Sequence, residues 1–128
     1  MIVLDASVLI AYLDADDNYH GRAGTLLARE IDDNFAVNSL TLAELLVVPA
    51  RENRLDVVRE ALRDLELQEL PFPADTAVKL ADLRASTNLK MPDCCVLLAA
   101  EDACARLASF DDRLADAATT RKLVTVRN

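Results

Sequence analysis

Hydrophobic and polar positions follow two different patterns along this chain. Short apolar runs bounded by polar residues, typical of strands buried in a parallel sheet, occur at 1–5, 34–38, 106–110 and 122–126, with a weaker one at 68–72. Apolar residues at helical spacing predict helices at 7–15, 20–31, 41–53, 54–67, 75–87, 92–105 and 111–118. We expect a helix break near Pro49 and Asn53. Alternating strands and helices predict an α/β fold with a mainly parallel sheet covered on both faces.

Composition supports a compact, helix-rich fold. The chain has 128 residues, of which 52% are hydrophobic, and it contains only four Pro and two Gly. This length predicts a single domain over residues 1–128. No basic residue precedes the first apolar run and no segment is long enough to span a membrane, so we expect a cytoplasmic protein. The three cysteines, Cys94, Cys95 and Cys104, include no CxxC pair, and we expect them to fill the core.

Four acidic residues stand where predicted strands end or predicted helices begin. Asp5 and Asp111 follow strands, whereas Glu44 and Asp93 lie near helix starts. Each acid has a simpler role: Asp5 and Asp111 can cap helices, Glu44 can form a capping box with Thr41, and Asp93 suits the positive end of a helix. In a parallel sheet, however, all four positions fall at one edge, where functional sites form.

Clustered carboxylates repel one another, so their gathering implies a cation. Oxygen ligands of this kind suit Mg²⁺, or Mn²⁺ as a substitute, and no Cys and His spacing suits zinc. The net charge of −8 is the wrong sign for binding nucleic acid by bulk electrostatics. An acidic protein that acts on phosphodiesters would therefore need metal ions, which activate water and stabilise the leaving oxygen.

Four stretches together resemble the PIN-domain nucleases and, within them, the VapC-like toxins of toxin-antitoxin pairs. These stretches are MIVLDASVLIAYL, TLAELL, MPDCCVLLAA and LASFDDRL. The resemblance implies a three-layer α/β/α sandwich and Mg²⁺- or Mn²⁺-dependent endonucleolytic cleavage of RNA, often tRNA or rRNA. It also implies a homodimer and inhibition by a small VapB-like antitoxin.

Carried onto this sequence, the resemblance assigns catalytic and metal-binding roles to Asp5, Glu44, Asp93 and Asp111. Ser7 matches a small hydroxyl residue that orients Asp5 or a bound water. The family commonly reads Thr-Asn-Asp at the last acid, whereas this chain has Ser109, Phe110 and Asp111 followed by Asp112. The departure leaves open whether Asp111, Asp112 or both serve the second metal.

Several other residues are weaker candidates. Lys90 and Arg84 are possible contacts for RNA phosphates, and Arg22 and Arg51 are further ones. Tyr12 and Tyr19 could each stack on a base, but a chain with 4% aromatic residues offers no obvious stacking platform. His20, the only histidine, is not needed when a metal activates the water.

Three alternatives compete with the nuclease. A receiver domain would need an acidic pair after the first strand, and a haloacid-dehalogenase-type phosphatase would need a second Asp where Ser7 stands. The third is a catalytically silent PIN-like module that acts only as a binding partner. Retention of four acids argues against it, because unneeded clustered charge destabilises a fold. For the nuclease, Asp5→Asn should abolish cleavage with little loss of stability.

Overall fold

The computed structural model describes residues 1–127, which contain five strands and seven helices. The strands are β1 (Ile2–Leu4), β2 (Phe35–Asn38), β3 (Gln68–Leu70), β4 (Arg106–Ala108) and β5 (Thr125–Val126). The helices are α1 (Ala6–Leu13), α2 (His20–Arg29), α3 (Ser39–Arg51), α4 (Leu55–Asp64), α5 (Thr76–Thr87), α6 (Met91–Asp102) and α7 (Asp112–Thr120). Every element predicted from the hydrophobic pattern is present, with shifted bounds.

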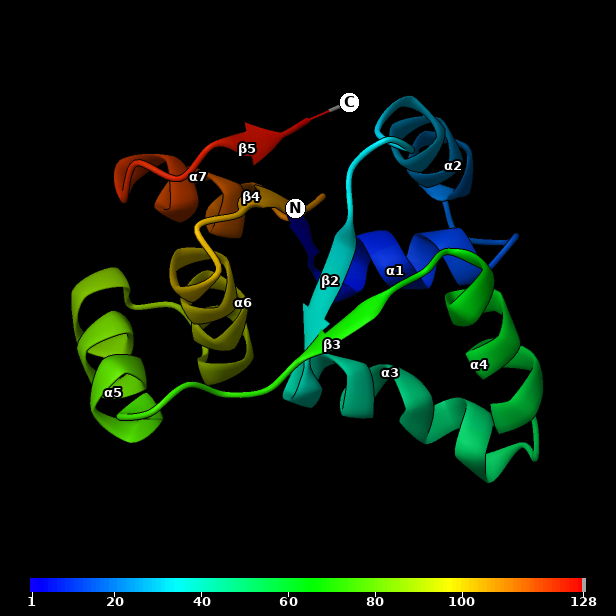
Figure 1. Ribbon diagram of the computed structural model, residues 1–128, viewed down its shortest axis with the longest axis horizontal. Coiled ribbons are helices and arrows are strands. Elements are labelled where there is room, and N and C mark those ends of the chain that lie inside the picture. Colours follow the sequence, from blue (N-terminus) through cyan, green and yellow to red (C-terminus); the bar gives the residue numbers. More distant parts are fainter. Residues whose placement is uncertain (128) are drawn as a thin grey trace.

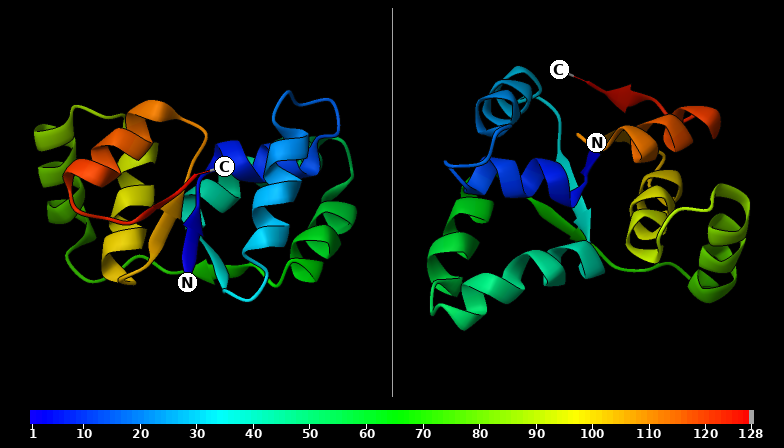
Figure 2. Two further views of the ribbon diagram at one scale, coloured as in Figure 1. Left: turned by 90° about the horizontal axis from the view of Figure 1, so that it is seen from above. Right: turned by 180° about the vertical axis from the view of Figure 1, so that it is seen from behind.

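All five strands are parallel and form one sheet in the order β3-β2-β1-β4-β5. Val3 in the central strand β1 lies opposite Ala36 of β2 on one side and Leu107 of β4 on the other. Helices α5, α6 and α7 cover one face, and α1, α2 and α4 cover the other (Figures 1 and 2). The predicted α/β/α sandwich is therefore confirmed.

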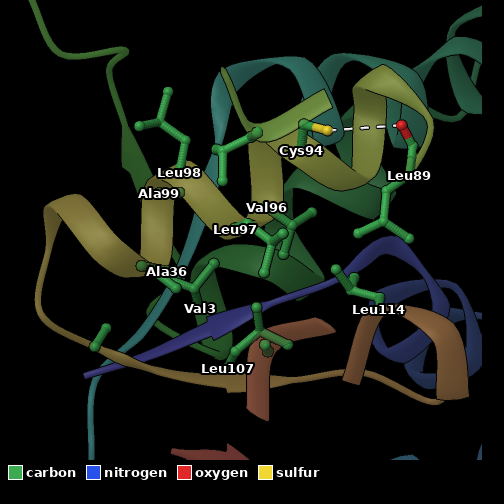
Figure 3. Packing of buried hydrophobic residues seen from close by; sticks show 14 residues of the cluster. Val3, Ala36, Leu89, Cys94, Val96, Leu97, Leu98, Ala99, Leu107 and Leu114 are labelled. Atoms are coloured by element: carbon green, nitrogen blue, oxygen red, sulfur yellow. Dashed lines mark hydrogen bonds between the residues drawn. The ribbon is translucent and has the colours of Figure 1, made fainter. Parts of the chain in front are cut away.

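Alternation along the strands creates a separate core on each face of the sheet. Val3, Ala36 and Leu107 point toward α6, which is buried from Cys94 to Ala100 (Figure 3). The intervening strand residues pack under α1, α2 and α4; they are Ile2, Leu4, Phe35, Val37 and Ala108. Because both faces are covered, the central strand β1 is apolar throughout, as expected for a buried parallel sheet, whereas the edge strand β3 is mostly exposed.

The expected helix break near Pro49 and Asn53 is confirmed, but Pro49 itself does not cause it. Helix α3 continues through Pro49 and ends at Arg51. Proline removes one donor of the helix, but its own carbonyl still accepts the backbone N–H of Arg54 at 2.8 Å. The break comes instead at Asn53, whose φ of 55° is left-handed and incompatible with a continuing helix.

The cysteine prediction is correct for two residues and wrong for the third. Cys94 and Cys95 are buried in α6, whereas Cys104 is exposed in the turn between α6 and β4. Its φ of 51° is left-handed, because the chain must reverse there to enter the sheet. Cys104 is therefore a turn residue and not core filler.

No helix within residues 1–127 is long and apolar enough to cross a membrane. The assignment of residues 1–128 to one domain stays a prediction, and its last residue, Asn128, lies outside the described part of the chain.

Candidate functional site

The candidate site lies at the carboxyl edge of the sheet, defined here as the edge where β1 and β4 end. Asp5 follows β1 directly and caps α1, its Oδ1 accepting the N–H of Ala6 at 2.7 Å. Asp111 lies beyond the end of β4 and caps α7, its Oδ1 accepting the N–H of Arg113 at 2.9 Å. Both acids therefore have the capping role that was their simpler interpretation.

Two serine hydroxyls from opposite ends of the chain hold the carboxylate of Asp5. This residue is 6% exposed, and its Oδ2 accepts hydrogen bonds from Ser7 at 2.9 Å and from Ser109 at 2.6 Å. Short hydroxyl bonds to an ionised carboxylate are among the stronger ones in proteins. With the Ala6 N–H included, three of about four acceptor positions are filled, which fixes the carboxylate and leaves one position open.

The same serines also join the ends of β1 and β4. The backbone N–H of Phe110 donates to Ser7 Oγ at 3.0 Å, and that of Asp111 donates to Ser109 Oγ at 2.9 Å. The hydroxyl of Ser109 therefore bridges the side chain of Asp5 and the backbone of Asp111. This bridge sets the position of the second acid relative to the first.

Asp93 interacts electrostatically with both of these acids. It lies in the first turn of α6 and is half-buried. Burial is the largest cause that raises the pKa of Asp93, followed by the negative charges of Asp5 and Asp111. The positive charges of Lys90 and Arg113 act in the opposite direction but do not cancel the rise. These three acids therefore form one electrostatic cluster.

Glu44 stands apart from this cluster. The expected capping box is wrong, because Asn38 caps α3 by accepting the N–H of Thr41 at 2.9 Å, which places Glu44 in the second turn. The side chain is exposed, and its charge helps to raise the pKa of Cys95 after burial and Cys94. It is not among the charges that raise the pKa of Asp93.

The donor chemistry of the cluster suits a hard divalent cation. Three carboxylates carry mutual repulsion that a cation would relieve, and one acceptor position of Asp5 is open. Within residues 1–127, however, no three His, Cys, Asp or Glu side chains converge as a ready-made metal centre. Ligation by these acids stays a prediction.

The remaining predicted residues surround the cluster at different positions. Asp112 is exposed and lines a neighbouring cavity, and it is not among the charges acting on Asp93. Lys90 is exposed at the start of α6. Arg84 donates a hydrogen bond to the carbonyl of Leu89 at 2.7 Å, so part of its guanidinium is used in the loop before α6.

Sequence analysis missed an aromatic pair next to the cluster. The rings of Tyr19 and Phe110 stack with centroids 5.2 Å apart and planes at 30°. The guanidinium of Arg22 lies 5.0 Å from the Tyr19 centroid and 5.1 Å from that of Phe110. The available signal was Phe110 itself, an aromatic residue at the position where the family resemblance leads one to expect Asn.

A five-stranded parallel sheet with helices on both faces is the arrangement of the PIN-like α/β/α fold. The chain belongs to the PIN domain family, whose model matches residues 2–119. PIN-domain nucleases typically use divalent metal ions. No curated protein matches the chain.

Three solved structures of bacterial proteins illustrate the shared fold. FitAcB from Neisseria gonorrhoeae is 22% identical, with 99% of this chain and 97% of that chain covered and a TM-score of 0.76. VapBC2 from Rickettsia felis, bound to a promoter DNA fragment, is 17% identical over 98% and 97%, with a TM-score of 0.73. VapC20 from Mycobacterium tuberculosis, a sarcin-ricin loop cleaving toxin, is 17% identical over 91% and 95%, with a TM-score of 0.74. At these identities the likeness establishes the fold.

Proposed function

We propose that the protein is a Mg²⁺-dependent endoribonuclease toxin of the VapC-like type, acting on tRNA or rRNA in the cytoplasm. The observation that carries this proposal is the cluster of Asp5, Asp93 and Asp111, in which the pKa of Asp93 is raised and Asp5 is fixed by two serines. Charge concentrated and held rigid in this way is typical of functional sites and costs stability when it has no function.

The protein's own residues have distinct roles in this proposal. Asp5 is the fixed ligand, and Asp93 presents its carboxylate from the rigid first turn of α6. Asp111 is favoured over Asp112 as the last acid, because Asp111 acts on the pKa of Asp93 and Asp112 does not. Glu44 would join through a side-chain rearrangement toward α6, where its charge already acts on Cys95.

Bound Mg²⁺, or Mn²⁺ in its place, would supply Lewis acidity and a water of lowered pKa for in-line attack on the phosphodiester. The acids would hold and orient that group, and Ser7 and Ser109 would position Asp5 for this task. Neutralising three or four carboxylates would also allow RNA phosphates to approach a protein of net charge −8. Lys90, and Arg84 with its remaining donors, would bind the phosphates beside Asp93.

A VapB-like antitoxin is the proposed inhibitor, and a homodimer the proposed assembly. One of the similar structures is a toxin-antitoxin complex from Klebsiella pneumoniae. A groove of about 650 Å³ lies between α1, α3 and α4, and exposed Ile10 and Val48 line it. We expect an apolar segment of the antitoxin to bind in this groove. Glu44 lines the same groove, so an antitoxin bound there would also cover one proposed ligand.

One observation favours the alternative of a catalytically silent PIN-like binding module. Glu44 is separated from the other acids, and no three potential ligands converge within residues 1–127. A silent module would keep the fold and the groove but would not bind Mg²⁺ or Mn²⁺ in the free protein.

The test is cleavage of a mixed tRNA and rRNA pool by purified protein with Mg²⁺, with Mn²⁺ and with EDTA. We compare Asp93→Asn with Asp56→Asn, since Asp56 is also an acid in the first turn of a helix but lies on α4. Discrete fragments that vanish with EDTA and with Asp93→Asn, but persist with Asp56→Asn, are expected. Intact RNA in every reaction, from folded protein free of inhibitor, would favour the silent module.

A further inference from the structure

A cavity of about 250 Å³ opens directly beside the acidic cluster. Its walls come from three separate parts of the chain: α2 and the residue before it, the segment from β4 into α7, and the residue after β5. The wall residues that matter here are Tyr19, Arg22, Ser109, Phe110, Asp112 and Arg127. Pockets for drug-sized ligands usually measure about 300–1,000 Å³, so this cavity suits a smaller planar group.

The cavity has an aromatic and cationic wall. Arg22 and the stacked rings of Tyr19 and Phe110 form a triangle in which all three centres are separated by 5.0 to 5.2 Å. Tyr19 is 42% exposed, so an aromatic surface faces solvent beside the site. Aromatic rings and guanidinium planes are the surfaces on which unpaired nucleobases stack.

The charges of the wall distinguish a base from a phosphate. Asp112 would repel a phosphate at the wall, but its carboxylate can accept a hydrogen bond from an amino group of a base. Arg22 and Arg127 also line the cavity, in a protein whose net charge is −8. Their guanidinium groups suit the phosphates on either side of an inserted base.

The cavity shares one wall with the acidic cluster. Ser109 lines it and donates a hydrogen bond to Asp5, and Phe110 is fixed through its backbone N–H to Ser7. A base inserted here would therefore hold the adjoining phosphodiester next to Asp5 and Asp111. Phe110 directly precedes Asp111, so the ring and the last acid are held by the same segment.

We propose that this cavity binds one unstacked nucleobase of the RNA, next to the phosphodiester that is cut, with a preference for bases that carry an amino group. The inference rests on the proposed nuclease function, whose substrate it refines. Tyr19 and Phe110 are the binding residues, and Arg22 holds their rings and the flanking phosphate.

The test uses short single-stranded RNA oligonucleotides with 2-aminopurine at one position each, because stacking quenches the fluorescence of this base. Binding is measured with Ca²⁺ in place of Mg²⁺, and cleavage is measured separately with Mg²⁺. The variants are Tyr19→Leu and Phe110→Leu, with Phe110→Tyr as the conservative change. Phe72→Leu is the matched control, since Phe72 is an exposed phenylalanine that lines a different cavity.

We expect quenching at one position, and about a tenfold rise in Kd and in KM for both leucine variants, because each variant removes an aromatic ring on which the base stacks. Phe110→Tyr keeps an aromatic face and should lose less binding than Phe110→Leu, whereas Phe72→Leu should behave like the wild type. If both leucine variants cleave RNA with an unchanged KM and give unchanged fragments, the proposed base binding is wrong, whereas the proposed nuclease function is unaffected.

Two further outcomes separate this inference from the proposed function. Quenching that the leucine variants abolish, in a protein that cuts no RNA, would support the base cavity and overturn the nuclease. If the wild type shows no quenching at any position, the cavity does not bind a nucleobase. The same conclusion follows if the leucine variants weaken only the binding of an antitoxin peptide.

Discussion

The two edges of the sheet differ in whether their acidic residues form ion pairs. At the amino edge, defined here as the edge where β1 and β4 begin, Arg106 pairs with Glu30 at 2.9 Å and with Asp33 at 2.8 Å. The N-terminal ammonium of Met1 also pairs with Asp33, at 2.6 Å. At the carboxyl edge, the ion pairs found within residues 1–127 include neither Asp5 nor the acids near it.

The pKa values of two aspartates reflect this difference. Hydrogen bonding to Arg106, then to the N-terminal ammonium, holds the pKa of Asp33 well below its ordinary value. Burial and neighbouring carboxylates raise the pKa of Asp93. At the amino edge, ion pairs therefore join structural elements. At the carboxyl edge, acids lie close together and their repulsion lowers the stability of the fold. That contrast, more than any single acid, distinguishes a site from a set of helix caps.

The largest effect should follow from Asp5→Asn. We expect cleavage to fall by more than about 100-fold, because even the outer partners of metal ligands contribute about 10–100-fold. Sequence alone suggested little loss of stability, but the amide cannot accept all three hydrogen bonds that Asp5 accepts. We therefore expect a loss of about 1–3 kcal/mol as well.

RNA cleavage assays and urea denaturation measure these two effects. The control is Asp14→Asn, because Asp14 also accepts a backbone N–H but lies at the exposed far end of α1. If the Asp5 variant cleaves RNA normally, the carboxyl edge of the sheet is not the active site.

Ser109→Ala should produce the next largest effect. The change leaves Asp5 and the backbone N–H of Asp111 each short of one partner, so we expect about a 10–100-fold loss in kcat/KM with most of it in kcat. Ser109→Thr keeps the hydroxyl and should restore activity. Ser86→Ala is the control, since that hydroxyl bonds only to carbonyls of its own helix. Equal kinetics for the Ala and Thr variants would mean that the bridge does not position the acids.

Opposite pH dependences of stability would sharpen the comparison of the edges. The lowered pKa of Asp33 contributes stability above its ordinary pKa of about 3.9, which is lost as the pH falls toward the folded value. The raised pKa of Asp93 favours the fold at low pH, and this contribution is lost as the pH rises through the folded value.

At neutral pH in EDTA, Asp33→Asn should therefore be less stable than the wild type and Asp93→Asn more stable. The difference for Asp33→Asn should shrink as the pH falls below about 4, whereas that for Asp93→Asn should already shrink at higher pH, as the pH falls through the raised pKa of folded Asp93. Urea denaturation across a pH series measures them. If both variants are less stable than the wild type at neutral pH, then the negative charges of the carboxyl edge are balanced by favourable interactions, and the contrast between the edges is wrong.

Most of the fold could be predicted from the sequence, because its rules are local. Apolar runs marked the strands, helical spacing marked the helices, and parallel strands brought Asp5 and Asp111 to one edge. The contact of Ser109 with Asp5 could not be derived, since 104 residues separate them and only tertiary packing sets the distance. The stacking of Tyr19 on Phe110 is non-local for the same reason.

The position of Glu44 escaped prediction for a different reason. The pattern Thr41-x-x-Glu44 matched a capping box, but the helix starts earlier because Asn38, the last residue of β2, is the stronger cap in this context. Its amide accepts the N–H of Thr41 and donates to the hydroxyl of the same residue. The helix therefore begins before Thr41, and Glu44 lies in its second turn, where it cannot complete a capping box.

The smallest effect should come from Cys104→Gly, at the amino edge just before β4. The left-handed φ of 51° costs an L-residue about 1–2 kcal/mol, and the greater freedom of glycine in the unfolded chain offsets up to about 1 kcal/mol. We therefore expect a gain below about 1 kcal/mol and unchanged cleavage. Asn88→Gly, at the C-cap of α5 in the connection to α6, is the control, because asparagine already tolerates its φ of 60° and should gain less. A change in cleavage with Cys104→Gly would mean that the amino edge is coupled to the site, and the division between a structural edge and a functional one would fail.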